Sequence, residues 1–429
     1  MSPPRRASML RALQHRNYRL FFSGQSVSLI GTWITRIATS WLVYRLTGSA
    51  LLLGIVGFCG QIPTLVLAPF AGVMVDRWSR HRILLATQVL SMLQSLALAV
   101  LALAGIITVT EILVLQIMQG IINSFDTPAR QAFVIEMVED RADLPNAIAL
   151  NSSMVTGSRI IGPTIGGVLI AAFGEGWCFM IDAISYVAVI ASLLAMHVSA
   201  DRRKSATRML DEMRDGWRYV WDFAPTRTVL MLLALVSTMG MPYMVLMPAV
   251  AEDILHGGAH TLGFLMTASG VGALIGALYL ATRASVMGLG RAIAIAAMVF
   301  GAGLAVFSLS HVLWLSLLLL PIVGGGFMVQ TASTNTILQT IVPEHLRGRV
   351  MAFYAMAFLG TAPIGSLVAG VVADRIGVPW TIFMGGIACI GGGILFWLRL
   401  PKIGEMIRPI YEERGIIPAG VPKAEAEAI

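Results

Sequence analysis

The chain is poor in charge: only 12% of its 429 residues are Asp, Glu, Lys or Arg, whereas 57% are apolar. Soluble domains carry about 25% charged residues. A chain with so little charge cannot cover a water-facing surface, so we expect lipid to be the solvent for most of it. Its net charge of +7 lies in short loops between apolar runs, which argues against a nucleic-acid partner.

The chain also lacks the residue patterns of metal sites and of hydrolytic enzymes. Its three cysteines, Cys59, Cys178 and Cys389, stand far apart, which suggests neither a metal site nor a disulfide framework. No Ser/His/Asp, Cys/His or HExxH arrangement and no G-x-x-x-x-G-K-[ST] loop is present. We therefore expect a protein that is not an enzyme, hydrolyses no ATP and uses no cofactor or metal.

Long apolar runs make up most of the chain. A membrane-spanning helix needs about 20 apolar residues, and twelve runs reach this length. They lie at roughly 20–44, 50–75, 83–106, 109–130, 147–173, 177–198, 228–251, 260–282, 291–310, 312–338, 350–373 and 379–399. The sequence thus predicts an all-α membrane protein with twelve transmembrane helices.

The charged segment 199–227 divides these helices six and six. We expect an N-terminal half (1–198), this linker, a C-terminal half (228–400) and a tail (401–429). With the N-terminus in the cytoplasm, 26 of the 30 Lys and Arg residues fall on the cytoplasmic side and 2 on the outside, which predicts cytoplasmic termini. The basic N-terminus has no signal-peptide cleavage site, so we expect the first helix to stay in the mature protein.

The two halves repeat each other weakly. A shift of 203 residues aligns LPNAIALN (144–151) with RGRVMAFY (347–354), and it aligns Gly174 with Gly377. Both halves keep the same orientation, so we predict two six-helix bundles in a parallel repeat, with the substrate held between them.

Residues 71–85, AGVMVDRWSRHRILL, form a charged turn between the second and third apolar runs. The spacing G-x-x-x-D-R-x-G-R-[RK], with Ser in place of the second glycine, is kept by Gly72, Asp76, Arg77 and Arg80. The turn resembles the signature loop of the major facilitator superfamily. In that family the loop latches the two halves together when the cavity faces outward, and the resemblance implies a latch here. A plain positive-inside anchor is the alternative.

A polar stripe follows one face of the fourth run. It comprises Gln116, Gln119, Asn123, Asp126 and Arg130, spaced 3, 4, 3 and 4 residues apart. We place its first three residues in the substrate cavity. Proton-coupled members of the superfamily carry Arg where Gln116 stands, so this chain departs from their coupling site.

The family places an acid near Asp126 that shares the latch arginine. We therefore hypothesise a relay through Asp76, Arg80 and Asp126. The alternative is that Asp126 only shapes the end of its helix.

The fifth run contains GSRIIGPTIGG, which resembles the GPxxGG pattern of superfamily exporters. Pro163 cannot donate a backbone hydrogen bond, which favours a bend. Close contact with neighbouring helices is allowed by Gly162, Gly166 and Gly167. Arg159 lies in the same run, where an arginine costs at least ~2.5–3.5 kcal/mol on insertion scales, so it should line a wet cavity or form a structural ion pair.

The remaining cavity residues are polar positions on the first, seventh and tenth runs. They are Thr35, Arg36, Thr39, Tyr243, Gln330 and Asn335. With the neighbouring Trp33 and Trp41, the first run suits an aromatic or anionic compound. Asp182 is another acid inside a run, and we assign proton coupling to it and to Asp126. For Asp182, an anchor at the wet outer end is the alternative.

The resemblance covers nearly the whole chain. Its stretches begin RALQHRNYRLFF, DTPARQAFVIEM and VPEHLRGRVMAF, and they match the branch of enterobactin-exporter-like and drug-exporting permeases, the transmembrane secretion effectors. The resemblance implies a monomer in the bacterial inner membrane that exports a siderophore or an amphipathic drug-like compound by alternating access and proton antiport. A lysophospholipid flippase of the same fold, an importer and a non-transporting scaffold are the alternatives.

Overall fold

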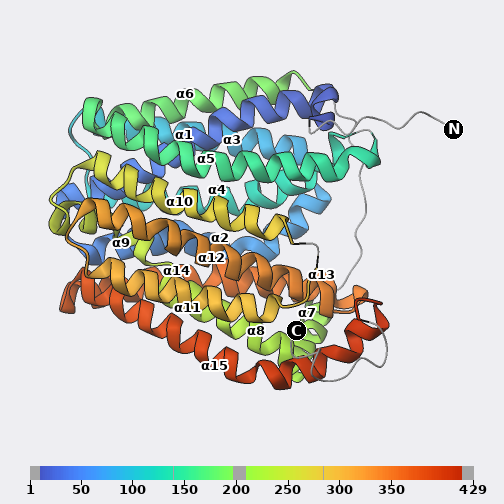
Figure 1. Cartoon of the computed structure of the whole chain (residues 1–429). Coiled ribbons are helices and arrows are strands. Elements are labelled where there is room, and N and C mark those ends of the chain that lie inside the picture. Colours follow the sequence, from blue (N-terminus) through green and yellow to red (C-terminus); the bar gives the residue numbers. More distant parts are fainter. Residues whose placement is uncertain (1–9, 139, 197–208, 284, 418–429) are drawn as a thin grey trace. The chain divides into compact units, whose positions relative to one another are not determined.

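The computed structural model describes residues 10–138, 140–196, 209–283 and 285–417, which contain helices and no strand (Figure 1). The long helices are α1 (Arg16–Thr47), α2 (Ala50–Arg77), α3 (Arg80–Leu103), α4 (Val109–Glu136), α5 (Leu144–Phe173), α6 (Glu175–Leu194), α10 (Ala259–Ala281), α11 (Leu289–Ser308), α12 (Leu313–Ile341) and α15 (Val378–Glu413). The shorter helices are α7 (Met209–Asp222), α8 (Ala224–Leu235), α9 (Tyr243–Ala249), α13 (Glu344–Ala355) and α14 (Thr361–Ile376). Single turns are η1 (Arg11–Gln14), η2 (Arg141–Asp143), η3 (Val236–Gly240), η4 (Val250–Ile254) and η5 (Met356–Gly360).

Ten helical stretches among the described residues are long and apolar enough to cross a membrane. Two of these stretches, α8 to η4 and α13 to α14, pass through π-helical turns. The two remaining expected runs are α1 and α4, which are 32 and 28 residues long and carry four charged residues each, among them Arg36 and Asp126. The chain is therefore a helical, multi-pass membrane protein.

The expected run 228–251 is not one regular α-helix. Its first part, α8, ends in the π-helical turn η3, and the turn η4 follows α9. Pro242 and Pro248 lie in this stretch and withhold backbone donors from the helical ladder. A missing donor leaves a carbonyl without its usual partner, which favours a local change of helix type.

Helix α15 continues well beyond its expected end at residue 399. Its extension buries an apolar face formed by Ile403, Ile407 and Tyr411, spaced four residues apart. Beyond the helix, Arg414 donates a hydrogen bond to the carbonyl of Val342 at 3.0 Å. The first part of the expected tail is therefore helical because it has a buried face to pack. Residues 199–208 of the linker and 418–429 of the tail lie outside the described residues.

Close packing divides the chain into two compact units. Unit 1 comprises Met1–Gly48, Cys59–Ala206 and Gly257–Thr267. Within it, α1 packs along α5 and α6, and α3 packs along α4 and α6 (Figure 1). Its N-terminal segment is fixed by Asp143, whose carboxylate contacts Arg11 at 2.5 Å and His15 at 3.2 Å.

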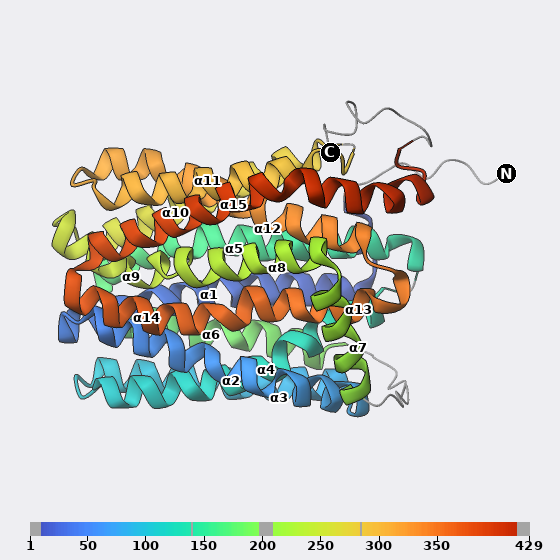
Figure 2. The same cartoon turned by 90° about the horizontal axis from the view of Figure 1, so that it is seen from below.

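Unit 2 comprises Ser49–Phe58, Thr207–His256 and Ala268–Ile429. Within it, α11 packs along α12 and α15 (Figure 2). Glycines allow this close packing: a Cβ on Gly301 would overlap the backbone of Gly386.

Each unit also contains one end of a helix whose remainder belongs to the other unit. In unit 2 the first residues of α2 lie against α14, where a Cβ on Gly54 would be 2.9 Å from the Cα of Gly370. In unit 1 the first residues of α10 lie against α5, where a Cβ on Gly263 would be 2.9 Å from the Cα of Gly167. Gly167 and Gly370 are 203 residues apart, the shift that aligns the two halves of the sequence.

Candidate functional site

Two arginines of unit 1 lie near one tryptophan ring; Arg36 is exposed, and Trp33 and Arg159 are half-buried. The guanidinium carbon of Arg36 lies 4.7 Å from the centroid of the Trp33 ring, and that of Arg159 lies 5.7 Å from it. A cation within about 6 Å of a ring centroid is attracted by the ring quadrupole, so the indole holds both side chains. Arg159 acts on Arg36 as a repelling positive charge. We call Trp33, Arg36 and Arg159 the arginine–tryptophan cluster.

The glycines of α5 bring this cluster together. A Cβ on Gly162 would overlap the Cβ of Trp33, and a Cβ on Gly166 would lie 3.3 Å from the Cα of Ile34. Without side chains at these positions, α5 lies directly against α1. Arg159, one turn before Gly162, is thereby placed beside the indole.

Replacing Gly162 with alanine is expected to lower the stability of unit 1 by about 1–3 kcal/mol, because an added methyl group in a close-packed contact forces the helices apart. The measurement is the thermal unfolding midpoint of the purified chain. Gly157→Ala is the matched control, since no described atom lies within 4 Å of a Cβ at that position of the same helix. Alanine favours a helix over glycine by about 1 kcal/mol, so the control should keep or raise the midpoint. Equal midpoints for both variants would contradict the packing role.

Asp182 lies buried in α6, with 1% of its surface exposed. The hydroxyl of Ser95 in α3 donates a hydrogen bond to its Oδ2 at 2.7 Å, and that of Ser185 reaches Oδ1 at 3.4 Å. Gly31 in α1 leaves room for the carboxylate, because a Cβ there would be 2.6 Å from Oδ1. Three helices therefore enclose this acid.

Asp126 in α4 is also buried, with 7% of its surface exposed. Its Oδ1 accepts hydrogen bonds from Gln88 Nε2 at 2.7 Å and Thr87 Oγ1 at 3.0 Å. A guanidinium nitrogen of Arg130, one turn further along α4, lies 3.5 Å from Oδ2. Asp126 is thus held by α3 and by its own helix.

A stripe of buried polar side chains on α3 connects the surroundings of the two acids. Its members are Thr87, Gln88, Ser91, Gln94 and Ser95. Gln119 donates to the hydroxyl of Ser91 at 3.3 Å and to Asn123 Oδ1 at 3.1 Å. Eight residues of helix rise about 12 Å, which is the length of the stripe.

The sequence interpretation missed this α3 stripe, although a signal was present. Its polar residues recur at i, i+1, i+4, i+7 and i+8 within an apolar run, which is the spacing of one helical face. Uncharged Ser, Thr and Gln side chains cost less to bury in a spanning helix than the acids that they contact, so they are a weaker sequence signal of a functional site.

Of the predicted latch residues, Arg80 has a partner that the sequence interpretation did not name. Its guanidinium donates to Glu136 Oε1 at 2.6 Å. Among the described residues, no atom lies within 4 Å of a Cβ placed on Gly72. The side chain of Asp76 lies outside the described part of the structure. Arg77 is exposed.

The predicted cavity residues of unit 2 lie among protein side chains. Tyr243 is 4% exposed, and its hydroxyl is 2.7 Å from that of Ser269. Gln330 is fully buried on α12, and Asn335 accepts a hydrogen bond from Gln339 at 2.6 Å.

On α1, Thr35 and Thr39 are buried. The hydroxyls of both residues have no partner within hydrogen-bond distance among the described residues, and that of Thr35 interacts electrostatically with the carboxylate of Asp182. Gln116 of α4 lies against Gly60 of α2. The part of unit 1 around α1 and α4 therefore holds buried polar groups next to the arginine–tryptophan cluster, which is on α1 and α5.

Buried acids, neighbouring arginines and a polar stripe inside membrane-length helices are typical of the functional site of a membrane transporter. The family model described as transmembrane secretion effector matches residues 7–411. The chain belongs to this family.

Relatives and solved structures agree with this assignment. The chain is 26% identical to the staphyloferrin A transporter of Staphylococcus aureus (strain NCTC 8325 / PS 47) over 90% of its own length and 96% of the relative's. It is 29% identical to the multidrug efflux pump Tap of Mycolicibacterium fortuitum, with 88% and 93% covered. A crystallised mutant of the nucleoside transporter NupG has the same fold, with a TM-score of 0.70 at 12% identity over 91% of this chain and 99% of that one.

These matches confirm that the chain is a transporter and not an enzyme. Together with the ten candidate spans, they confirm the expected multi-pass protein of a bacterial plasma membrane.

Proposed function

We propose that this chain exports an anionic small organic molecule, of the siderophore or drug-like class, by alternating access. The arginine–tryptophan cluster carries this proposal. Each arginine within a spanning helix costs at least ~2.5–3.5 kcal/mol on insertion scales, and two of them on one indole repel each other. An anionic ligand would relieve this repulsion, because guanidinium groups bind carboxylates and other oxyanions through paired hydrogen bonds.

The indole ring that both guanidiniums approach narrows the substrate class further. An indole stacks on aromatic or planar groups, whereas the guanidiniums bind oxygen anions. A carboxylate- or catecholate-bearing siderophore has both features. The likeness to the staphyloferrin A transporter supports this choice.

Export of neutral drug-like compounds is the second candidate. It is favoured by the likeness to the pump Tap and to macrolide efflux protein A of Streptococcus pyogenes, 26% identical over 88% of this chain and 96% of the relative. For such substrates the cluster would contribute mainly its indole surface.

For the topology we propose twelve transmembrane helices in two six-helix halves, 1–198 and 228–400. This counts α1 and α4 as spans beside the ten apolar stretches. The distribution of Lys and Arg, with 26 of 30 on one side, supports cytoplasmic termini. The cluster and both acids belong to one chain, so a monomer suffices for the proposed transport.

For the coupling we propose proton antiport through Asp182 and Asp126. Both are buried acids within the proposed spanning helices, and acids in such positions commonly belong to substrate, ion or proton pathways. The α3 stripe supports this assignment, because its hydroxyl and amide groups contact both carboxylates. The predicted latch of Gly72, Asp76, Arg77 and Arg80 stays part of this proposal, with Glu136 as an added partner.

The test compares the small molecules secreted by cells with and without the gene under limited iron. Loss of one anionic chelator from the medium, with its accumulation inside the cells, is the expected result.

Inverted membrane vesicles then establish the direction of transport, since a proton-coupled exporter moves its substrate into such vesicles when their interior is acidic. An unchanged secretion profile and no vesicle uptake of anionic chelators would contradict the siderophore proposal. Movement of a fluorescent lipid analogue in proteoliposomes would instead identify a flippase.

A further inference from the structure

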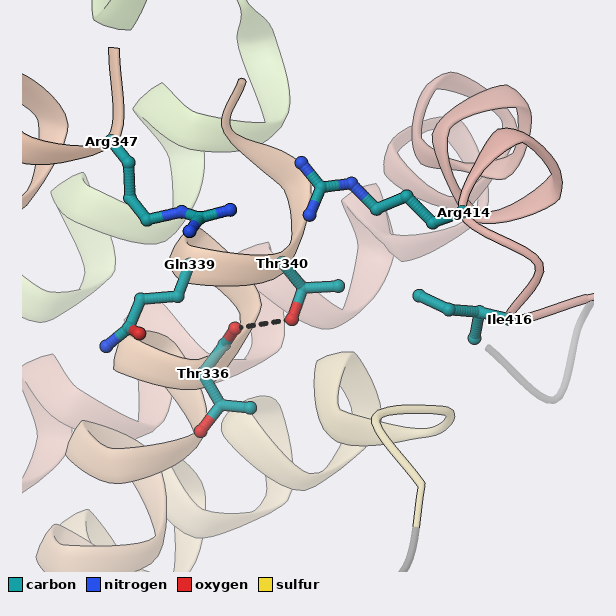
Figure 3. Close-up of a pocket in the computed structure, with 6 residues that line it drawn as sticks. All are labelled: Thr336, Gln339, Thr340, Arg347, Arg414 and Ile416. Carbon is teal, nitrogen blue, oxygen red and sulfur yellow. Dashed lines mark hydrogen bonds between the residues drawn. The ribbon is translucent and has the colours of Figure 1, made fainter. Parts of the chain in front are cut away.

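A second set of arginines lies in unit 2. The end of α12, the start of α13 and the residues after α15 form an open surface pocket of about 590 Å³ (Figure 3). It is lined by Thr336, Gln339, Thr340, Arg347, Arg414 and Ile416. None of these residues belongs to the arginine–tryptophan cluster or to the two buried acids.

The charge of this pocket is positive. Arg347 and Arg414 extend toward each other from opposite sides of it (Figure 3), and no acid is among the described residues that line it. Glu344 is a weak partner, because its Oε1 is 3.7 Å from a guanidinium nitrogen of Arg347 and its side chain is 88% exposed. Water screens exposed ion pairs of this kind, so they add little stability. The pocket therefore holds two guanidinium groups close together, and its described lining residues supply no negative charge to balance them.

Hydrogen-bond donors in the pocket are not fully used by the protein. The Nε of Arg347 is buried and has no acceptor among the described residues. Arg414 donates to the carbonyl of Val342, which occupies part of a guanidinium with five N–H donors. A buried donor without an acceptor is costly, so a ligand that supplies oxygen atoms here would be stabilised.

The floor of the pocket supplies acceptors rather than donors. The hydroxyl of Thr340 donates to the carbonyl of Thr336 at 2.8 Å (Figure 3), and that of Thr336 donates to the carbonyl of Ala332 at 3.0 Å. The amide nitrogen of Gln339 donates to Asn335. The side-chain oxygens of these three residues keep lone pairs that can accept hydrogen bonds from a ligand's hydroxyl groups.

We propose that this pocket binds a phosphate group carried by a polyol. The two guanidiniums match phosphate oxygens in paired hydrogen bonds, and the Thr and Gln oxygens accept from the polyol hydroxyls. The pocket lies at the end of the membrane-length helix α12, where lipid headgroups meet a membrane protein. The phosphate source is the headgroup of an anionic lipid such as phosphatidylglycerol, or a soluble glycerol phosphate.

The test titrates the purified full-length chain in neutral detergent with three probes, and thermophoresis measures the binding of each probe. The probes are dioctanoyl phosphatidylglycerol, dioctanoyl phosphatidylcholine and sn-glycerol 3-phosphate. We expect saturable binding of phosphatidylglycerol, at least tenfold tighter than that of phosphatidylcholine. Arg347→Gln combined with Arg414→Gln should weaken it at least tenfold, since charge-assisted hydrogen bonds are lost. The corresponding double Lys variant keeps the charge but not the planar fork and should weaken it only several-fold.

Arg408→Gln is the matched control. Arg408 lies on α15 near the pocket but pairs with Glu412 at 2.8 Å, so its replacement should leave phosphatidylglycerol affinity unchanged. Comparable affinity for glycerol phosphate would identify a soluble ligand, and binding of the lipid alone would identify a headgroup. The proposal is overturned if neither phosphate probe saturates, or if the double Gln variant, shown to be folded by its unfolding midpoint, binds phosphatidylglycerol as the wild type does. Should that variant not fold, full wild-type affinity of each single Gln variant would overturn it equally.

Discussion

Replacing Arg36 with glutamine is expected to weaken the binding of an anionic substrate by about 10- to 100-fold, because charge-assisted hydrogen bonds contribute roughly 1.5–3 kcal/mol. The substrate is the anionic chelator identified by the secretion comparison, and the measurement is its concentration dependence of transport in proteoliposomes. Arg36→Lys should retain part of the affinity, since it keeps the charge and loses the planar fork that lies against Trp33. A neutral drug-like substrate should respond little to either change.

Arg45→Gln provides the control on the same helix. Arg45 forms a two-contact ion pair with Glu175, at 2.8 and 3.0 Å, away from the cluster. Its side chain is 53% exposed, so the pair adds about 0–1 kcal/mol of stability at most. This variant should keep the substrate affinity of the wild type. If Arg36→Gln also keeps it, for anionic and neutral compounds alike, the cluster serves packing and not recognition.

Of the arginine–tryptophan cluster, the sequence predicts the candidate arginines but not their arrangement. The cost of a charge in lipid identifies Arg36 and Arg159 as candidate site residues without any structure. Their convergence on one indole could not be predicted, because it depends on how closely α1 and α5 approach. That approach is set by Gly162, whose missing side chain makes room for Trp33.

The neighbour of Arg80 shows the opposite case. The sequence interpretation ended the fourth helix near residue 130 and placed Asp126 near its cytoplasmic end, where the family resemblance implies an acid that shares the latch arginine. The helix in fact continues to Glu136, with Pro128 inside it. Those added residues place Glu136 within reach of Arg80. Helix ends are set by packing and capping that composition alone does not reveal, and the shorter predicted helix left Glu136 out of the candidate latch residues.

Asp182→Asn is expected to reduce transport driven by a pH gradient to the background level while leaving substrate exchange across the membrane intact. Asparagine has nearly the same shape as aspartate but cannot carry a proton. It would still fit the space left by Gly31 and the contacts with Ser95 and Ser185, so the fold should be retained. The measurement compares gradient-driven uptake with substrate–substrate exchange in the same proteoliposomes. Exchange requires binding and alternating access but no net proton movement, so it separates coupling from recognition.

Glu175→Gln is the control for Asp182, because it changes another carboxylate of α6 whose partner is the guanidinium of Arg45. It should leave gradient-driven transport unchanged. Asp126→Asn, alone and combined with Asp182→Asn, then shows which acid carries the proton. Loss of gradient-driven transport in one single variant identifies that acid as the proton carrier. Loss only in the double variant means that either acid suffices. Full gradient-driven transport in both single variants and in the double variant would reject both acids. The α3 stripe would then serve helix packing, and the coupling would have to be sought elsewhere in the chain.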